Sequence, residues 1–395
     1  MSIALSSRSL GARGSIIREL LKKAAQPGMI SFGGGSPDPL SFPSQEISRR
    51  VRAAFENNSK ALLSYGISEG FPDLVASLKA YLADREGICF ENNELIILSG
   101  GQQCADLTAR LLVNEGDRVL VESPSFVGCL NAFRAYGGKL VGVPMDREGM
   151  DLNLLEEALQ GQRISLLYTI PTFQNPTGFS ASLENRRAVY ALARRYDVPI
   201  LEDNPYGELR FEGEKLPSLK SMDVDGRVLY MCSFSKTLAP GLRVGWLVVP
   251  KPLFTAFKIA KQSADVHSCT LYQQVCHELL TQWDYEAHLE KIRALYQQKC
   301  QRMDQEMRDH LHPAITWNKP QGGLFIMMFL PQGMDALPLV DAAARRGVIT
   351  VPGSAFMADP DAPHNGIRLN YSMPSLDQIS QGIRLLGEES YRLLA

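Results

Sequence analysis

The sequence predicts an α/β protein built on a mostly parallel sheet of seven strands, with helices on both faces. Short, continuously apolar runs recur along the central part of the chain, and helical patterns separate many of them. Such runs are typical of strands buried on both faces, and alternation with helices is typical of parallel sheets. The length of 395 residues and the hydrophobic content of 45% allow a large core and more than one domain.

The elements of this sheet follow one another in order. The basic, weakly amphipathic segment up to about residue 25 predicts a short helix. Glycines and prolines at 33–39 predict a loop, because glycine supplies unusual dihedral angles and proline interrupts ladders. Helical spacing then begins at Pro72. The expected strands are Leu95–Leu98, Val119–Val121, Leu140–Val143, Ile164–Ile170, Val198–Leu201, Val228–Cys232 and Gly245–Val249.

The C-terminal third has a looser order. A helical region covers about 252–312, strand candidates follow at Gly323–Leu330 and Ile367–Tyr371, and helices are expected near 335–346 and 375–391. This order predicts a smaller α+β domain, completed by the N-terminal segment. The expected division is an N-terminal contribution to the small domain at 1–50, a large domain at 51–290 and the small domain at 291–395.

Composition excludes several classes of function. The formal net charge of −2 gives no strong attraction to nucleic acid. The seven cysteines are scattered and form no CxxC pair, which indicates reduced thiols in the cytoplasm. The sequence contains no HExxH pattern, so it gives no indication of a zinc site. The N-terminus lacks a signal-peptide core, and no apolar run approaches the roughly 18 residues of a membrane span. We therefore expect a cytoplasmic protein with no metal, nucleic-acid or membrane partner.

The segment Ser233–Trp246 gives the strongest indication of chemistry. It follows an apolar run, so Lys236 stands at a strand exit, where partial burial lowers the pKa of an amine and favours Schiff-base chemistry. Ser233, Ser235 and Arg243 offer hydroxyls and a guanidinium that suit a phosphate dianion. A lysine in solvent is the alternative, which the flanking serines, Pro-Gly pair and arginine disfavour.

The letters of this segment, SFSKTLAPGLRVGW, resemble the cofactor-lysine signature of fold-type I pyridoxal-phosphate aminotransferases. Five further segments resemble elements of that family in the required order, so the resemblance extends over nearly the whole chain. They are Ser64-Tyr65-Gly66 with Glu69-Gly70, Ser99–Gln103, Pro171–Gly178, Glu202–Tyr206 and Ile367–Leu369. One match would be weak, whereas six in register identify the chain as a member of this group, near the kynurenine/2-aminoadipate aminotransferases and similar bacterial multi-substrate enzymes.

The resemblance implies pyridoxal 5′-phosphate as the cofactor, held as a Schiff base on Lys236. Gly100, Gly101 and Gln102 lie between an expected strand and helix, where backbone N–H groups favour a phosphate. A glycine-rich turn without a ligand is the alternative for these three residues. The two serines and the arginine of the lysine segment would complete the phosphate site.

Other residues would hold the cofactor ring. Asp203 would pair with the pyridine nitrogen and keep it protonated, which makes the ring an electron sink; a helix-capping aspartate is the alternative. Asn175 and Tyr206 would hydrogen-bond the phenolic oxygen, although Asn175 also fits a plain turn. Phe126 would stack on the ring where many relatives carry tyrosine, and a core phenylalanine is its alternative.

The substrate and subunit contacts follow from the same resemblance. Arg368 would bind the α-carboxylate of the substrate with its planar guanidinium; a surface arginine is the alternative for this residue. Asn175 would also contact the substrate, and Gly35 would line the substrate pocket. Arg18 resembles a mobile arginine that meets distal carboxylates, but its spacing to the glycine segment is short, and a solvated helix arginine is the alternative. Tyr65 would reach the phosphate of a neighbouring subunit, which implies a homodimer with shared active sites; a buried structural tyrosine is the alternative.

The implied reaction is a two-stage amino transfer from an α-amino acid to a 2-oxo acid, such as 2-oxoglutarate, with ping-pong kinetics. The amine of Lys236 would act as general base and acid, on a broad range of aromatic, aliphatic or dicarboxylic substrates. Elimination, decarboxylation or ring closure on the same scaffold are alternatives, because cofactor motifs do not define the reaction. A ligand-sensing domain of a winged-helix transcription regulator is disfavoured, because about 30 residues precede the glycine loop.

Overall fold

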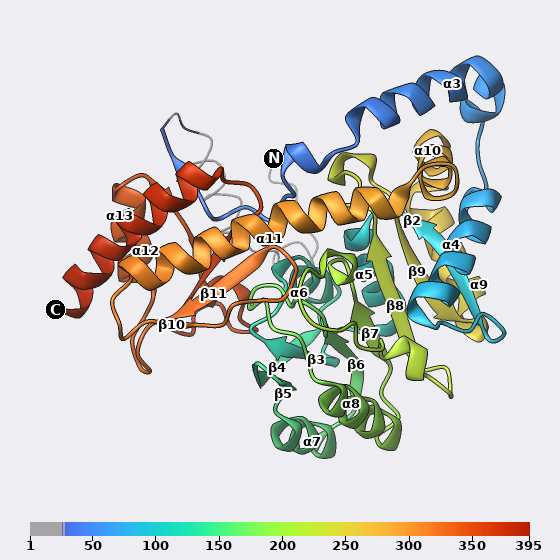
Figure 1. Ribbon diagram of the computed structural model, residues 1–395. Coiled ribbons are helices and arrows are strands. Elements are labelled where there is room, and N and C mark those ends of the chain that lie inside the picture. The colour runs from blue at the N-terminus through green and yellow to red at the C-terminus, as the bar shows by residue number, and fades with distance from the viewer. Residues whose placement is uncertain (1–25, 27) are drawn as a thin grey trace, which may run out of the picture.

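A computed structural model describes residue 26 and residues 28–395, and it contains a large and a smaller sheet (Figure 1). Among these residues the large sheet has eight strands, in the order β2-β9-β8-β7-β6-β3-β4-β5. Their bounds are β2 (Asn93–Leu98), β3 (Arg118–Ser123), β4 (Lys139–Asp146), β5 (Gly149–Met150), β6 (Ile164–Thr169), β7 (Ile200–Asp203), β8 (Val228–Ser233) and β9 (Gly245–Pro250). The strands from β8 to β4 are parallel, and β9 is antiparallel to both of its neighbours.

The α/β class and the seven expected strands are confirmed, with two corrections. The count of seven was one short, because the two-residue strand β5 pairs antiparallel with β4. The limits of all seven expected strands also differ from expectation, by one to three residues at one or both ends. Strand β7 begins only after Pro199, which has no N–H to donate, and β6 ends before Pro171.

Helices cover both faces of the large sheet (Figure 1). On one face lie α5 (Gly101–Leu112), α6 (Val127–Ala135) and α9 (Lys251–Asp265), and on the other lie α4 (Pro72–Glu86), α7 (Leu152–Gly161), α8 (Leu183–Arg195) and α10 (Thr270–Thr281). Successive residues of β6 divide between the faces: Leu166 and Tyr168 pack with the first set, and Leu167 with the second. A strand covered on both sides must be apolar throughout, which explains the continuous runs in the sequence.

The helical region expected at 252–312 consists of three helices. Helix α9 ends where Val266 adopts a positive φ of 66°, and α10 follows. Helix α11 (Tyr285–His310) is capped at its N-terminus by Asp284, whose side chain accepts the N–H of Ala287. Its 26 residues span about 39 Å at 1.5 Å per residue, and it extends from the large sheet to the smaller one (Figure 1).

The smaller sheet is antiparallel, in the order β10-β11-β14-β13. Its strands are β10 (Thr316–Trp317), β11 (Phe325–Phe329), β13 (Val351–Pro352) and β14 (Gly366–Asn370), with helices α12 (Leu337–Arg345) and α13 (Leu376–Leu394) nearby. Strand β1 (Ile30–Ser31) pairs with β12 (Val348–Ile349), and α3 (Ser44–Leu62) packs on α10. The expected boundary at residue 290 falls inside the continuous α11, and the three domain ranges stay a prediction.

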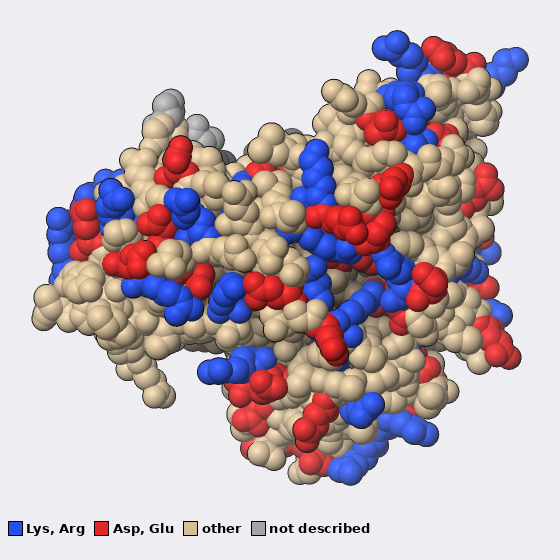
Figure 2. Space-filling view, viewed as in Figure 1, with Lys and Arg blue, Asp and Glu red and all other residues tan. Residues whose placement is uncertain are grey.

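Charged side chains of both signs are interspersed over the face seen in Figure 2, without a broad field of one sign. None of the described helices combines the length and apolar character needed to cross a membrane. Within residues 28–395, no group of three or more His, Cys, Asp or Glu side chains is arranged to hold a metal ion.

Candidate active site

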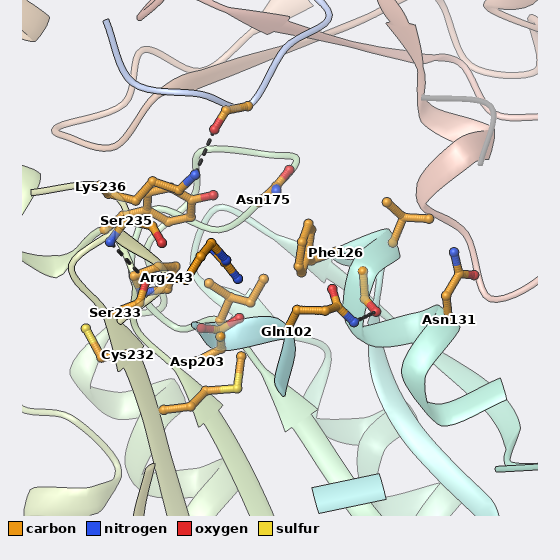
Figure 3. Close-up of a pocket in the computed structure, with 18 of the residues that line it drawn as sticks. Gln102, Phe126, Asn131, Asn175, Asp203, Cys232, Ser233, Ser235, Lys236 and Arg243 are labelled. Atoms are coloured by element: carbon orange, nitrogen blue, oxygen red, sulfur yellow. Dashed lines mark hydrogen bonds between the residues drawn. The ribbon is translucent and has the colours of Figure 1, made fainter. Parts of the chain in front are cut away.

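A cavity of about 700 Å³ lies beyond the carboxyl ends of β7 and β8, between the large sheet and residues of the smaller one. Twelve of the fifteen residues predicted from the sequence line it: Gly35, Gly101, Gln102, Phe126, Asn175, Asp203, Tyr206, Ser233, Ser235, Lys236, Arg243 and Arg368. Figure 3 shows many of these side chains around the cavity, with Phe126 across from Lys236. The volume is typical of a site for a small molecule.

Two of the predicted residues that the structure describes, Gly100 and Tyr65, do not line the cavity. Gly100 packs against the guanidinium of Arg243 instead. Tyr65 is 89% exposed on the surface of its own chain, so the alternative of a buried structural tyrosine is wrong. Arg18 lies outside the described residues, as does the helix expected before residue 25.

Lys236 lies in the turn that follows β8. Its half-buried side chain enters the cavity, and Nζ donates a hydrogen bond to the carbonyl of Gly35 (2.8 Å, Figure 3). Burial lowers the pKa of this amine to about 8; the charge of Arg368 lowers it further, and that of Asp203 opposes the shift. Near neutral pH the unprotonated, nucleophilic fraction of this amine is therefore much larger than that of an ordinary lysine.

The anion-binding end of the cavity is formed by the first turn of α5 and the segment after β8. Gly101 opens the helix, so its N–H groups and dipole face the cavity. Arg243 donates through Nη2 to the carbonyl of Ser99 (2.7 Å). Gly100 has a φ of +83°, and a Cβ there would lie 2.4 Å from Nη2 of Arg243. The glycine thus makes room for the arginine, a role that sequence spacing did not predict.

Asp203 ends β7 and is buried. Its Oδ2 accepts a hydrogen bond from the hydroxyl of Tyr168 in β6 (2.8 Å). Burial raises the pKa of Asp203 to about 7, the bond from Tyr168 opposes this, and the neighbouring Glu122 adds to it. A carboxyl group in this setting favours a cationic partner, such as a protonated ring nitrogen.

Arg368, on β14, is buried and held on several sides. Nη1 donates to Oδ1 of Asn175 (2.9 Å), and Nη2 donates to the carbonyl of Gly33 (2.7 Å). The rings of Phe325 and Phe356 lie 4.5 and 4.7 Å from the guanidinium carbon. Burial lowers the pKa of Arg368 to about 10, so the side chain stays charged at neutral pH. Its Nε has no hydrogen-bond partner among the described residues.

Sequence reasoning missed several residues of the site. Val127, Gly128, Asn131, Ile170, Pro205, Met231 and Cys232 also line the cavity. Tyr168 holds Asp203 from outside it. One signal was present in the sequence: a tyrosine hydroxyl within a continuously buried strand requires a polar partner. Its identity depends on how β6 and β7 pair, which the chain order does not give.

These groups fit pyridoxal 5′-phosphate. The helix start, the hydroxyls of Ser233 and Ser235 and the Arg243 guanidinium suit a phosphate. At the other end, Lys236 offers an amine to an aldehyde, and Asp203 offers a carboxylate to a pyridine nitrogen. Fold and site together define a pyridoxal-phosphate enzyme of the α/β class.

Comparison with known proteins gives the family. The family model for aminotransferase class I and II matches residues 29–384, and the chain belongs to this family. It is 37% identical to aromatic-amino-acid aminotransferase 1 of Thermococcus litoralis, covering 97% of this chain and 93% of that protein. It is also 37% identical to 2-aminoadipate transaminase of Thermus thermophilus, covering 96% of this chain and 95% of that protein.

A solved structure of a related enzyme supports the same family assignment. The kynurenine aminotransferase of Pyrococcus horikoshii, determined in complex with PMP, superposes with a TM-score of 0.95 at 37% identity, over 99% of this chain and 98% of that one. The chain is therefore a pyridoxal-phosphate-dependent aminotransferase of fold type I, as the sequence predicted. The alternatives of a lyase and of a sensor domain are not favoured.

Proposed function

We propose that this enzyme transfers the amino group of a broad range of α-amino acids to a 2-oxo acid, with 2-oxoglutarate as the acceptor, by ping-pong kinetics. The observation that carries the proposal is the arrangement of the Lys236 amine and the Arg368 guanidinium in one cavity. The carbonyl of Gly35 holds the amine of Lys236, while that of Gly33 holds the guanidinium of Arg368. An α-amino acid presents its carboxylate and its α-carbon within a few ångströms of each other, which suits this pair.

Four of the predicted residues carry the main roles in this proposal. When bound, pyridoxal phosphate supplies an electron sink that makes the α-proton of an amino acid acidic. The unprotonated amine of Lys236 takes that proton and returns it during the transfer. Arg368 anchors the α-carboxylate with a planar fork. Asp203 stabilises a protonated ring nitrogen, and Phe126 provides a flat face for the ring.

The substrate range follows from the cavity lining. Apart from Lys236, Arg243, Arg368 and Asp203, the cavity-lining residues within the described part of the chain are uncharged. Each of these four has a proposed role with the cofactor or the α-carboxylate, which leaves a neutral space for the substrate side chain. The relatives are named for aromatic amino acids, 2-aminoadipate and kynurenine, which supports aromatic and dicarboxylic donors here. Arg18 remains the candidate for a distal carboxylate.

The assembly we propose is a homodimer with shared active sites. Leu63, Tyr65 and Ile67 are 76%, 89% and 55% exposed, an unusual density of apolar surface on one short segment. The ring of Tyr65 packs edge-on against His267, at 6.1 Å between centroids. A second copy covering this segment would let Tyr65 reach the neighbouring phosphate site. The seven cysteines are unpaired, which supports the cytoplasmic location that we propose.

A panel of amino donors tests the proposed function. Each α-amino acid is added without an acceptor, and the absorbance of the bound cofactor is followed. Accumulation of the amine form of the cofactor, followed by its reversal with 2-oxoglutarate, is the expected result. Release of ammonia and a keto acid without an acceptor would indicate a lyase instead. No change with any α-amino acid would refute the proposal.

A further inference from the structure

Glu122 is a buried carboxylate next to the site that the proposed roles leave unused. It is the penultimate residue of β3 and is 3% exposed. Its Oε1 accepts the hydroxyl of Thr169 (2.6 Å) and the N–H of Ile170 (3.0 Å), and its Oε2 accepts the amide of Gln174 (2.9 Å). Burial raises the pKa of Glu122, and these three bonds oppose the shift. Removal of the charge would therefore disturb three hydrogen bonds at once, at the end of β6 and in the loop that follows it.

Gln174 is the residue through which Glu122 reaches the cavity. Its Nε2 donates to Glu122 and also to the carbonyl of Pro124 (2.8 Å). Its Oε1 accepts both the N–H and the hydroxyl of Thr177 (2.9 and 2.8 Å). All four hydrogen-bonding positions of this amide are thus occupied, and the side chain is fully buried. Such an amide has one orientation, which fixes the loop on both sides of residue 175.

Asn175, the next residue, connects this loop to the site. Its Oδ1 accepts a hydrogen bond from Nη1 of Arg368 (2.9 Å), and it lines the same cavity as Tyr206. We propose that Glu122, acting through Gln174, is a positioning residue. It sets the place of Asn175, on which cofactor binding depends, and thereby of Arg368, on which binding of the substrate carboxylate depends. This inference rests on the proposed roles of Asn175 and Arg368.

Glu202 provides a matched control. It is also a buried glutamate near the end of a strand, 1% exposed, in β7 directly before Asp203. Its oxygens accept the N–H groups of Leu219 and Lys220 (2.9 and 2.8 Å), which belong to a segment that does not line the cavity. Both glutamates also raise the pKa of Asp203, so a general electrostatic effect would be common to the two variants.

The experiment compares Glu122→Gln, Glu202→Gln and the exchange variant E122Q/Q174E. In Glu122→Gln, one carboxylate oxygen is replaced by an N–H₂ group. That group must face at least one of the donors whose hydrogen bond the carboxylate accepts in wild type. We expect KM for an α-amino acid and the dissociation constant of pyridoxal phosphate, titrated into the cofactor-free protein, each to rise about tenfold, the effect of one lost buried hydrogen bond. The change in kcat should be smaller. Glu202→Gln should lower the melting temperature but leave both constants unchanged within error.

The exchange variant separates positioning from folding. With the carboxylate at 174 and the amide at 122, the bonds to Thr169, Ile170 and Thr177 can all form again, whereas the bond to Pro124 is lost and a carboxylate oxygen faces that carbonyl oxygen. We therefore expect a partial recovery of the loss in both constants. If Glu122→Gln does not fold, Thr169→Val replaces it, because it removes one of the three bonds and should shift both constants in the same direction.

Equal KM and equal cofactor affinity in Glu122→Gln and wild type would overturn the proposal, as would no recovery in a folded exchange variant. The same effects in Glu202→Gln would overturn it too. Arg368→Lys and Asn175→Ala test the proposed roles directly. If those variants lose affinity while Glu122→Gln does not, the inference fails and the proposed function stands.

Discussion

Replacement of Gly100 by alanine should weaken cofactor binding, whereas the same change at Gly101 should not. Gly100 has φ +83° and ψ 173°, a backbone conformation that residues with a Cβ rarely adopt. For alanine at this position the backbone strain costs about 1–3 kcal/mol. The new Cβ would lie 2.4 Å from Nη2 and 2.9 Å from Cζ of Arg243, so the guanidinium must move. At Gly101 the nearest atom to a Cβ is the methyl carbon of Met231 at 3.8 Å, an ordinary contact.

The two costs appear in different measurements. Backbone strain is present without cofactor, so it lowers the melting temperature of the cofactor-free protein. Displacement of Arg243 removes a hydrogen bond to a charged phosphate, worth about 1.5–3 kcal/mol, which corresponds to an increase of about 10- to 100-fold in the dissociation constant. Absorbance titration of the cofactor-free protein with pyridoxal phosphate measures that constant for both variants. Unchanged affinity in Gly100→Ala, or an equal loss in Gly101→Ala, would refute this reading of the glycine pair.

Two further predictions concern the cations of the cavity. Arg368→Lys keeps the charge but loses the planar guanidinium, so KM for α-amino acids should rise by about 10- to 100-fold with little change in cofactor affinity. Steady-state kinetics with several amino donors measures KM, and an unchanged KM would contradict the prediction. Because burial lowers the pKa of Lys236 to about 8, the rate of cofactor capture by the cofactor-free protein should rise through that pH and then level off. Stopped-flow absorbance follows the capture, and a rate that keeps rising toward 10.5, the ordinary pKa of lysine, would contradict the assignment.

The sequence predicted the parts of this molecule that depend on local order. Parallel strands buried on both faces need continuous apolar runs, and each run marked a strand. The phosphate end of the site is also local, because Gly101 follows β2 directly and opens α5. Lys236 and Arg243 are likewise close to the end of β8, so their spacing alone placed them near one another.

Contacts between distant segments could not be predicted in this way. The bond from Tyr168 to Asp203 depends on the side-by-side pairing of β6 and β7. Arg243 meets the carbonyl of Ser99 across 144 positions of sequence, which is why the part of Gly100 in making space for it was not predicted. The sequence did not single out Glu122, since its three donors lie about 50 residues away along the chain. Spacing identifies a motif, whereas packing decides which side chains support it.

The central claim is that Lys236 carries the cofactor and moves the proton in amino transfer. Lys236→Ala tests it most directly, with cofactor absorbance and turnover of an α-amino acid measured on the same folded sample. The account predicts that the variant loses the visible absorbance band of the lysine-bound cofactor and loses turnover, while the melting temperature without cofactor stays near that of wild type. Borohydride reduction should attach the cofactor to the peptide that contains Lys236 in wild type alone. Full turnover in Lys236→Ala, or attachment at another lysine, would contradict the claim.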